Sequence, residues 1–192
     1  LGSVCDDVEA VVTHLRGQGK KVGLVSIKLL QPFPEAEVVA ALAGKKAVTV
    51  LERSDQAALT PLVMQALFKA RENAELKRGE TERHAGIPAI KATPKLTTAI
   101  FGLGGHDLQP RHLIAAFKNM ESGKGASLIY LGSQFFSKTT NPRMAELQKR
   151  MKAAYPETEL MALETEENPR LLPDSAFRVR FHSVGGYGTI AS

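Results

Sequence analysis

Three glycines near the end of the chain form the pattern with the clearest chemical meaning. Gly185, Gly186 and Gly188 follow residues 177–182, in which Phe and Val alternate with Arg and His. This alternation is typical of a half-buried strand, and residues 189–192 fit the first turn of a helix. A glycine loop between a strand and a helix lets backbone amides approach an anion closely. The three glycines are therefore candidate cofactor-binding residues, with tightly packed turn glycines as the alternative.

A second glycine loop, 102–105, follows a predicted strand at 97–101. A dinucleotide-binding fingerprint needs glycine at its first, third and sixth positions, and Asp107 stands at the sixth. We therefore interpret this loop as a turn whose glycines adopt positive φ, rather than as a phosphate site.

Charged residues cluster at the end of another predicted strand, 47–51. Glu52, Arg53 and Asp55 follow it directly, and open parallel sheets bind ligands at the carboxyl ends of their strands. Acid–base chemistry is one interpretation. An ion pair or a contact to a neighbouring domain is the one that we favour, because charges at strand ends often serve structure.

The other residue types that support catalysis or metal binding form no recognisable set. The five histidines belong to neither a G-x-S-x-G elbow nor an H-E-x-x-H pair. They are His14, His84, His106, His112 and His182. The single cysteine, Cys5, can form no internal disulfide and cannot alone hold zinc or an iron–sulfur cluster. The sequence therefore predicts no catalytic residue and no metal site.

Composition narrows the class of protein. Of the 192 residues, 43% are hydrophobic and 23% charged, which is typical of a globular domain. The net charge of +5 comes from interleaved basic and acidic residues with few aromatics, so we expect no nucleic-acid binding. No apolar run approaches the length of a membrane span, and one cysteine fits a reducing cytoplasm.

Helical and strand patterns alternate along the chain. Apolar spacing predicts helices over 4–15 and 35–42, from Pro61, from Pro110, and over 142–155. Strands are expected at 22–27, 47–51, 97–101, 126–131 and 160–163, and a polar surface excursion at 73–95. This order predicts an open, mainly parallel α/β sheet with helices on both faces. Because the chain begins on a helix and on Leu rather than Met, we expect that a first strand has been trimmed.

Several motifs, in this order, resemble the transketolase C-terminal-like domain (domain II) of pyruvate:ferredoxin (flavodoxin) oxidoreductases. Residues 30–34 resemble the family's R-P-F corner, with Gln31 for Arg, and residues 50–53 resemble its V-L-D-R, with Glu52 for Asp. Residues 101–110 resemble its Y-G-L-G-S-K-(E/D)-F-x-P. Residues 177–192 resemble the first strand and glycine loop of the following gamma domain, with Tyr187 where relatives have Gln or Ala.

The resemblance implies three parts: a transketolase C-terminal-like domain at 1–135, an extension and linker at 136–175, and the start of a gamma-type domain at 176–192. It implies a non-catalytic scaffold that docks the thiamine-binding domain to the gamma domain, with no cofactor of its own beyond a contact at Gly185, Gly186 and Gly188. The parent enzyme would use thiamine diphosphate, Mg²⁺, iron–sulfur clusters and coenzyme A. It would be a cytoplasmic homo-oligomer that passes electrons from a 2-oxoacid to ferredoxin or flavodoxin.

Two other interpretations stay open at this point. One is the corresponding domain of another thiamine enzyme, a transketolase or a 2-oxoacid dehydrogenase beta subunit. The glycine loop at 185–188 argues against it, because those chains end with this domain. The other is a free-standing module that binds a nucleotide or an anion.

Overall fold

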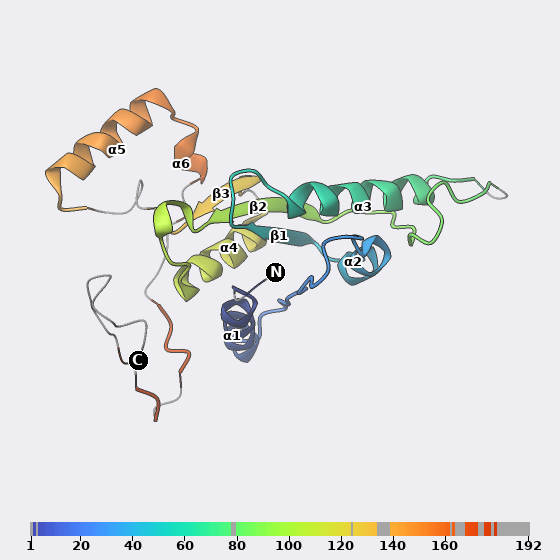
Figure 1. Cartoon of the computed structure of the whole chain (residues 1–192), viewed down its shortest axis with the longest axis horizontal. Coiled ribbons are helices and arrows are strands. Elements are labelled where there is room, and N and C mark those ends of the chain that lie inside the picture. The colour runs from blue at the N-terminus through green and yellow to red at the C-terminus, as the bar shows by residue number, and fades with distance from the viewer. Residues whose placement is uncertain are drawn as a thin grey trace.

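The protein is built around a small parallel sheet, seen in a computed structural model (Figure 1). The structure describes residues 2, 4–77, 80–123, 125–133, 139–161, 163, 168–172, 175–177 and 179. Three strands lie in the order β1 (Ala47–Glu52), β2 (Lys95–Phe101) and β3 (Leu128–Leu131). Both pairings are parallel, with Val50 opposite Thr98 and Ile100 opposite Tyr130. The predicted open parallel α/β sheet is confirmed.

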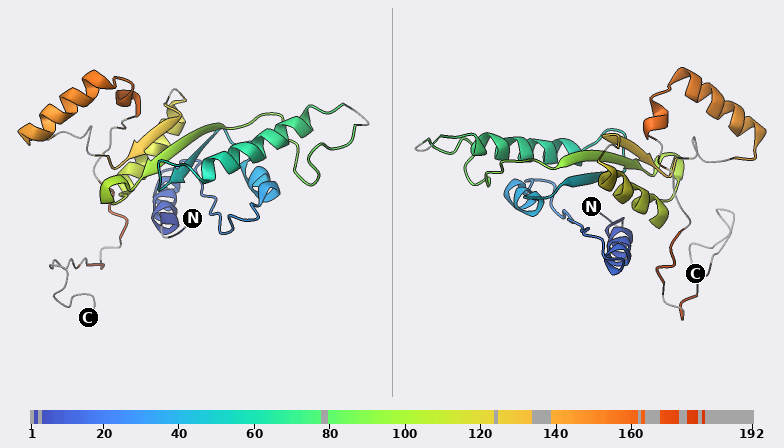
Figure 2. Two further views of the ribbon diagram at one scale, coloured as in Figure 1. Left: turned by 45° about the horizontal axis from the view of Figure 1, so that its top comes forward. Right: turned by 180° about the vertical axis from the view of Figure 1, so that it is seen from behind.

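Helices cover both faces of this sheet, as predicted. α2 (Glu35–Leu42) and α3 (Leu59–Ala74) pack on one face, and α1 (Val4–Gly17) and α4 (Pro110–Ser122) on the other. Figures 1 and 2 show α3 and α4 on opposite sides of the strands. A short 3-10 turn, η1 (Leu103–Gly105), follows β2, and α5 (Pro142–Ala154) and α6 (Thr158–Met161) follow β3.

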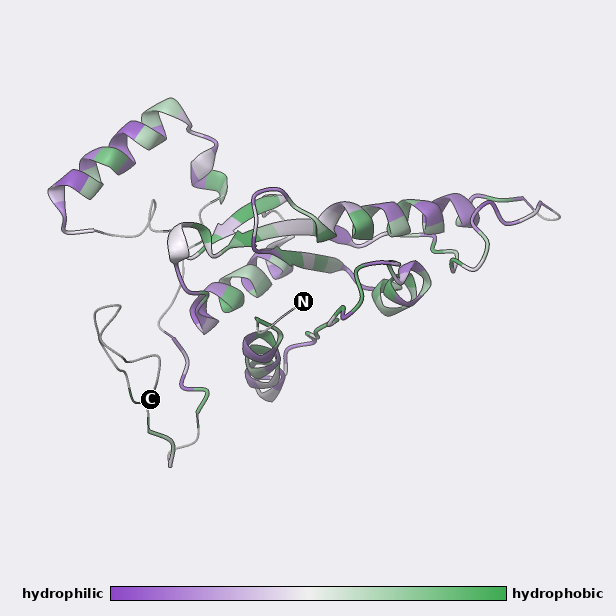
Figure 3. Ribbon diagram, viewed as in Figure 1, coloured by the Kyte–Doolittle hydropathy of each residue, from purple (hydrophilic) through white to green (hydrophobic). Residues whose placement is uncertain are grey.

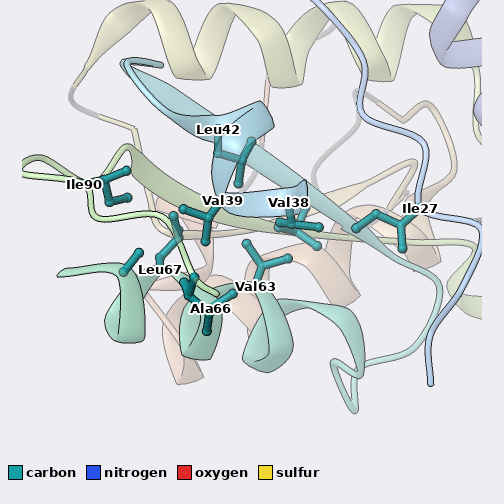
Figure 4. Packing of buried hydrophobic residues seen from close by; sticks show 11 residues of the cluster. Ile27, Val38, Val39, Leu42, Val63, Ala66, Leu67 and Ile90 are labelled. Atoms are coloured by element: carbon teal, nitrogen blue, oxygen red, sulfur yellow. The ribbon is translucent and has the colours of Figure 1, made fainter. Parts of the chain in front are cut away.

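The first core layer lies between the sheet, α2 and α3 (Figure 4). Val63, Ala66 and Leu67 of α3 meet Val38 and Val39 of α2 there, and all five side chains are buried. Alternation along β1 turns Val48 and Val50 towards this layer and Leu51 towards the other.

The second layer holds α1 and α4. Its apolar residues from α1 recur at helical spacing, which explains why this segment folds as an amphipathic helix. They are Val8, Val11, Val12 and Leu15. Ala99, Phe101, Ile129 and Leu131 bring the strands to the same layer. Figure 3 shows largely hydrophobic strands between helices that carry one polar side.

The predicted excursion after α3 is only partly at the surface. Ile87 and Ile90 are buried in the first layer. Asn73, itself buried, holds the segment in place: its Nδ2 donates to the backbone oxygens of His84 (2.8 Å) and Ile87 (2.9 Å), and its Oδ1 accepts from the His84 amide (3.0 Å). An amide side chain therefore gives this irregular segment the backbone partners that a strand would supply.

Two predicted strands are wrong. Residues 22–27 belong to no strand, and α6 takes in Leu160 and Met161 of the predicted strand at 160–163. Residues 22–27 have the composition of a strand but pair with no strand in the described part of the chain. Pro61 is also not the first residue of its helix, because α3 begins two residues earlier, at Leu59. Of the strand predicted at 177–182, Phe177 and Val179 are described and lie outside any strand, while the other four positions lie outside the described residues.

α5 stands apart from the sheet in all three views of Figures 1 and 2. Its first turn is capped by Asn141, whose Oδ1 accepts from the amides of Arg143 (3.0 Å) and Met144 (3.4 Å). None of its residues is buried, so local capping, rather than core packing, defines this helix. Of the helices in the described ranges, none is long and apolar enough to cross a membrane.

Candidate functional site

The carboxyl edge of β1 is the site to which the sequence points, and Glu52 there is a helix cap. Its side chain is 6% exposed. Oε1 accepts from the amides of Leu59 (2.8 Å) and Thr60 (2.5 Å), and Oε2 from that of Ala58 (3.3 Å). These amides begin α3, and Ala58 at the N-cap position has no side-chain acceptor. The carboxylate also meets the positive end of the helix dipole.

The other two residues of the predicted cluster point elsewhere. Asp55 closes its own turn, since Oδ1 accepts from the Gln56 amide (3.0 Å) and the Ser54 hydroxyl (3.4 Å). Arg53 is exposed and lies against the loop after β2: a Cβ on Gly102 would stand 3.5 Å from Arg53 Cγ. Among the described residues its guanidinium has neither a hydrogen-bond nor an ion-pair partner. Glu52 and Asp55 therefore do not converge as an acid–base pair.

A cavity of about 310 Å³ opens beside this edge. Its apolar wall includes Leu30, Leu51 and Phe101, and its polar rim includes Arg53 and Ser54. The start of α1 closes it with Gly2 and Val4. Arg53 is thus the unpaired charge at the rim of a largely apolar hollow, which suits contact with a carboxylate or with a neighbouring protein surface.

The loop after β2 behaves as a turn, as the sequence predicts. Gly102, Gly104 and Gly105 have φ of +76°, +66° and +73°, a region that side chains rarely enter. His106 and Asp107, which follow, are exposed. Because Arg53 lies against Gly102, the charged cluster after β1 and the glycine loop after β2 are neighbours in the structure.

His112 is a structural residue that the sequence analysis missed. It is buried at the start of α4, and its Nδ1 accepts from the Gln109 amide at 3.1 Å. Burial, assisted by the neighbouring charge of Arg111, lowers the pKa of His112 to about 4, so the ring is neutral at pH 7. The signal was present in the sequence: position 112 lies three residues after a helix-opening Gln109, the spacing of a capping box.

The remaining titratable groups lie apart from this edge. His84 Nε2 and Arg83 Nη1 contact the carboxylate of Glu72, at 2.7 Å and 2.6 Å. The hydrogen bond with His84 and the charge of Arg83 hold the pKa of Glu72 below its usual value. The Ser26 hydroxyl donates to Cys5 Sγ at 3.3 Å. These contacts tie segments of the fold together.

Two predictions concern bound groups: cofactor contacts at three glycines, and the absence of a metal site. Gly185, Gly186 and Gly188 lie outside the described residues. Within the described ranges, no three His, Cys, Asp or Glu side chains converge to hold a metal ion. With a single cysteine, these residues do not fit an iron–sulfur cluster either.

Comparison with known proteins gives the geometry its context. Residues 1–113 match the family described as "Pyruvate:ferredoxin oxidoreductase core domain II". Pyruvate synthase subunit PorA of Thermotoga maritima is 32% identical over 127 residues, which are 64% of this chain and 27% of that subunit. The subunit of the same name from Methanothermobacter thermautotrophicus is 30% identical over 132 residues, 69% of this chain and 29% of the subunit. The pyruvate-flavodoxin oxidoreductase of Klebsiella pneumoniae is 31% identical over 123 residues, 62% of this chain and 9% of that protein.

The geometry explains how the fold accommodates the two positions at which the sequence departs from the motifs that it resembles. Glu52 replaces Asp in the V-L-D-R motif but keeps the carboxylate, and a carboxylate is what the α3 cap requires. Gln31, in place of Arg, is exposed at the corner before α2. The chain spans little more than a quarter of each PorA subunit that it matches, and the match begins with α1 and continues through β1, β2 and the start of α4. Sequence, fold and capped strand end agree: this chain belongs to the pyruvate:ferredoxin oxidoreductase core domain II family.

Proposed function

We propose that this chain acts as a scaffold within a 2-oxoacid:ferredoxin or flavodoxin oxidoreductase, with pyruvate as the substrate of the complete enzyme. Its role is to dock the thiamine-binding domain to the gamma domain. Support comes from the domain II match over residues 1–113 and from relatives named pyruvate synthase and pyruvate-flavodoxin oxidoreductase.

The main observation in favour of the scaffold role is that Glu52 caps a helix with both of its carboxylate oxygens. A carboxylate at the carboxyl end of a parallel strand stands where α/β enzymes place ligands and catalytic groups. In this chain its two oxygens accept three backbone hydrogen bonds from the start of α3. Glu52 therefore holds a helix, and Arg53 beside it is left exposed for contact with a neighbouring surface.

The chemistry belongs, on this proposal, to other parts of the enzyme. Thiamine diphosphate with Mg²⁺ would stabilise the carbanion formed on decarboxylation, iron–sulfur clusters would carry electrons, and coenzyme A would accept the acyl group. The described residues do not fit a metal or cluster site, so no step of that reaction is assigned to them.

The finer organisation also remains part of the proposal. Residues 1–135 form the docking domain, 136–175 an extension and linker, and 176–192 the start of the gamma domain. Gly185, Gly186 and Gly188 shape a ligand or interdomain surface, on the strength of their strand–loop–helix pattern. The complete enzyme is a cytoplasmic homo-oligomer with ferredoxin or flavodoxin as its electron acceptor.

Calorimetry on the purified chain tests whether it binds a cofactor or co-substrate of the complete enzyme. Thiamine diphosphate with Mg²⁺, coenzyme A and NAD are titrated in turn, and we expect no saturable heat from any of them. A complete pyruvate oxidoreductase, titrated with thiamine diphosphate, is the positive control. Micromolar binding of any one of the three to this chain would contradict the scaffold role.

A chimera tests docking itself. The matched segment of the Thermotoga maritima PorA subunit is replaced by residues 1–113 of this chain, and co-purification with the other subunits is measured. We expect the complex to form. A second chimera carrying Arg53→Glu, a surface change, should assemble more weakly. If the two chimeras assemble equally well, Arg53 does not contribute to the interface. If the first chimera folds normally but does not assemble, the scaffold role is wrong.

A further inference from the structure

Residues 168–171, in the part of the chain that the sequence assigns to a linker, are bound to the start of α4. The side-chain amide of Asn168 makes two hydrogen bonds there. Its Oδ1 accepts from the Arg111 amide at 3.1 Å, and its Nδ2 donates to Gln109 Oε1 at 3.2 Å. In Figure 1 the segment runs down from the start of α4, near the red end of the colour scale. Because Asn168 and its partners are far apart in the sequence, these are tertiary contacts and not those of a local turn.

The start of α4 suits an asparagine side chain. Amides in the first turn of a helix have no partner within the helix, and Pro110 has no amide to donate. The Arg111 amide is therefore the first donor that α4 presents. A side-chain amide can accept from this N–H and donate to the Gln109 oxygen at the same time, whereas a carboxylate can only accept. The contact thus selects for asparagine as well as capping the helix.

Two apolar side chains of the segment lie between α1 and α4. Pro169 forms part of the wall of a groove of about 210 Å³. The other apolar residues of that wall are Leu15, Val22, Ile114 and Phe117. Leu171 packs against the buried apolar cluster that α1 and α4 share. Pro169 and Leu171 are half-buried, whereas Arg170 and Leu172 are exposed, which is the alternation of an extended peptide lying on a surface.

We propose that the start of α4 and the groove between α1 and α4 form a binding site for an extended peptide of the pattern Asn-Pro-x-Leu, which residues 168–171 occupy in cis. The helix start and Gln109 recognise the asparagine. The apolar side chains of the two helices recognise the proline and the leucine. The chain's own segment lies in the site, and this identifies the occupant.

The contacts are few and partly open to solvent, so attachment to the rest of the chain holds the segment in place. Asn168 itself is exposed. Leu163, five residues earlier, packs against a cluster from β2, β3 and α4, which keeps the segment close to its site. Attachment of this kind acts as a local concentration in roughly the millimolar range. A free peptide should therefore bind weakly, and only where the cis segment has been displaced.

An occupied site fixes the point at which the chain leaves this domain. This consequence rests on the proposed function, in which the residues that follow lead to a gamma-type domain. With the site occupied, that domain extends from the side of the scaffold formed by α1 and α4. With the site empty, the segment after Leu163 would be a free tether, and the position of the next domain would not be set.

Proteolysis of the full chain tests the contact in cis. The double variant Asn168→Ala/Leu171→Ala removes the amide and the apolar contact, and Leu172→Ala, at the exposed neighbouring position, is the matched control. Trypsin cleavage after Arg170 is measured for each chain, relative to a free peptide of the same sequence. We expect cleavage to be about tenfold faster in the double variant than in the wild type or the control. Slow hydrogen exchange of β2 verifies that each chain is folded, and the single variant Asn168→Ala replaces the double variant if that one unfolds.

A peptide of residues 167–172 with blocked ends tests the site in trans. It is added to the isotope-labelled double variant, and backbone amide shifts are followed by NMR. We expect saturable shifts at Arg111 and Ile114, with a Kd in roughly the millimolar range, and none in the wild type, whose site is occupied. A peptide with Ala in place of the Asn and the Leu is the control and should shift neither amide.

Four outcomes would overturn the proposal. Two concern cleavage: the folded double variant is cleaved no faster than the wild type, or Leu172→Ala is cleaved as fast as the double variant. Two concern the peptide: the natural sequence shifts neither amide, or the Ala control shifts both equally. All four are measured on this chain alone, so they leave the scaffold role to be decided by the chimera.

Discussion

At the scale of single residues, Glu52 shows how a strand end and a helix start are joined. Glu52→Gln keeps the size of the side chain but replaces one acceptor oxygen with a donor and removes the charge that meets the α3 dipole. We expect a loss of about 1–2 kcal/mol in the free energy of unfolding, measured by urea denaturation. Glu37→Gln, on the exposed side of α2, is the control and should change stability by less than about 0.5 kcal/mol. If the Glu52 variant and the wild type are equally stable, Glu52 does not stabilise α3 as a cap.

His112 gives the fold a dependence on pH. Burial holds its pKa at about 4, against 6.5 in its ordinary state, so the unfolded chain binds a proton first as the pH falls. The associated stability is complete above about pH 6.5 and is lost between there and about pH 4, which amounts to about 2 kcal/mol by pH 5. His112→Gln keeps an acceptor at the capping-box position and removes the titration. We expect its urea stability to fall about 2 kcal/mol less than that of the wild type between pH 7.5 and pH 5.

A matched variant separates this residue from general acid effects. His106→Gln changes an exposed imidazole in the loop after β2. It should keep the full wild-type slope of stability against pH. If His106→Gln and His112→Gln flatten the slope equally, burial of His112 is not its cause.

At the scale of elements, the irregular segment after α3 depends on one side chain. Asn73→Ala leaves the His84 amide and the backbone oxygens of His84 and Ile87 without their partners. We expect a loss of about 2–3 kcal/mol in unfolding free energy and faster proteolysis within 75–94. Gln65→Ala, on the exposed side of the same helix, should do neither. Unchanged proteolysis in the Asn73 variant would show that burial of Ile87 and Ile90 alone holds the segment.

The elements also show where sequence reasoning succeeds. Period 3.6 predicted α1 and α2, and short β-branched runs predicted β1 and β2, because each of these patterns is fixed by a local core contact. The strand prediction at 22–27 is wrong for a physical reason. A strand is defined by hydrogen bonds to a neighbouring strand, and the residue pattern within one segment carries no information about that neighbour. The strand prediction at 160–163 is wrong because a short apolar run fits a helical turn as well as a strand, and Leu160 and Met161 complete the turn of α6.

At the scale of the whole molecule, the candidate site was predictable in place but not in role. The cluster at 52–55 follows a strand, and that position alone predicts a location at the carboxyl edge. The capping role of Glu52 depends on where α3 begins, and the sequence placed that start at Pro61 rather than Leu59. An error of two residues in the predicted start of α3 was therefore enough to hide the structural role of Glu52 and to leave ligand binding as an interpretation.

The distribution of stability follows from the same architecture. β2 is paired on both sides and lies between two helical layers, so we expect its amides to exchange only on global unfolding. Residues 21–32 have one buried side chain, Ile27, and no backbone pairing in the described structure, so their amides should exchange about as fast as those of an unfolded chain. Hydrogen exchange of the unmodified chain measures both at once. Protection of 22–27 comparable with that of 95–101 would mean that the segment is already paired in solution, and that its amides are not open to solvent as the structure has them.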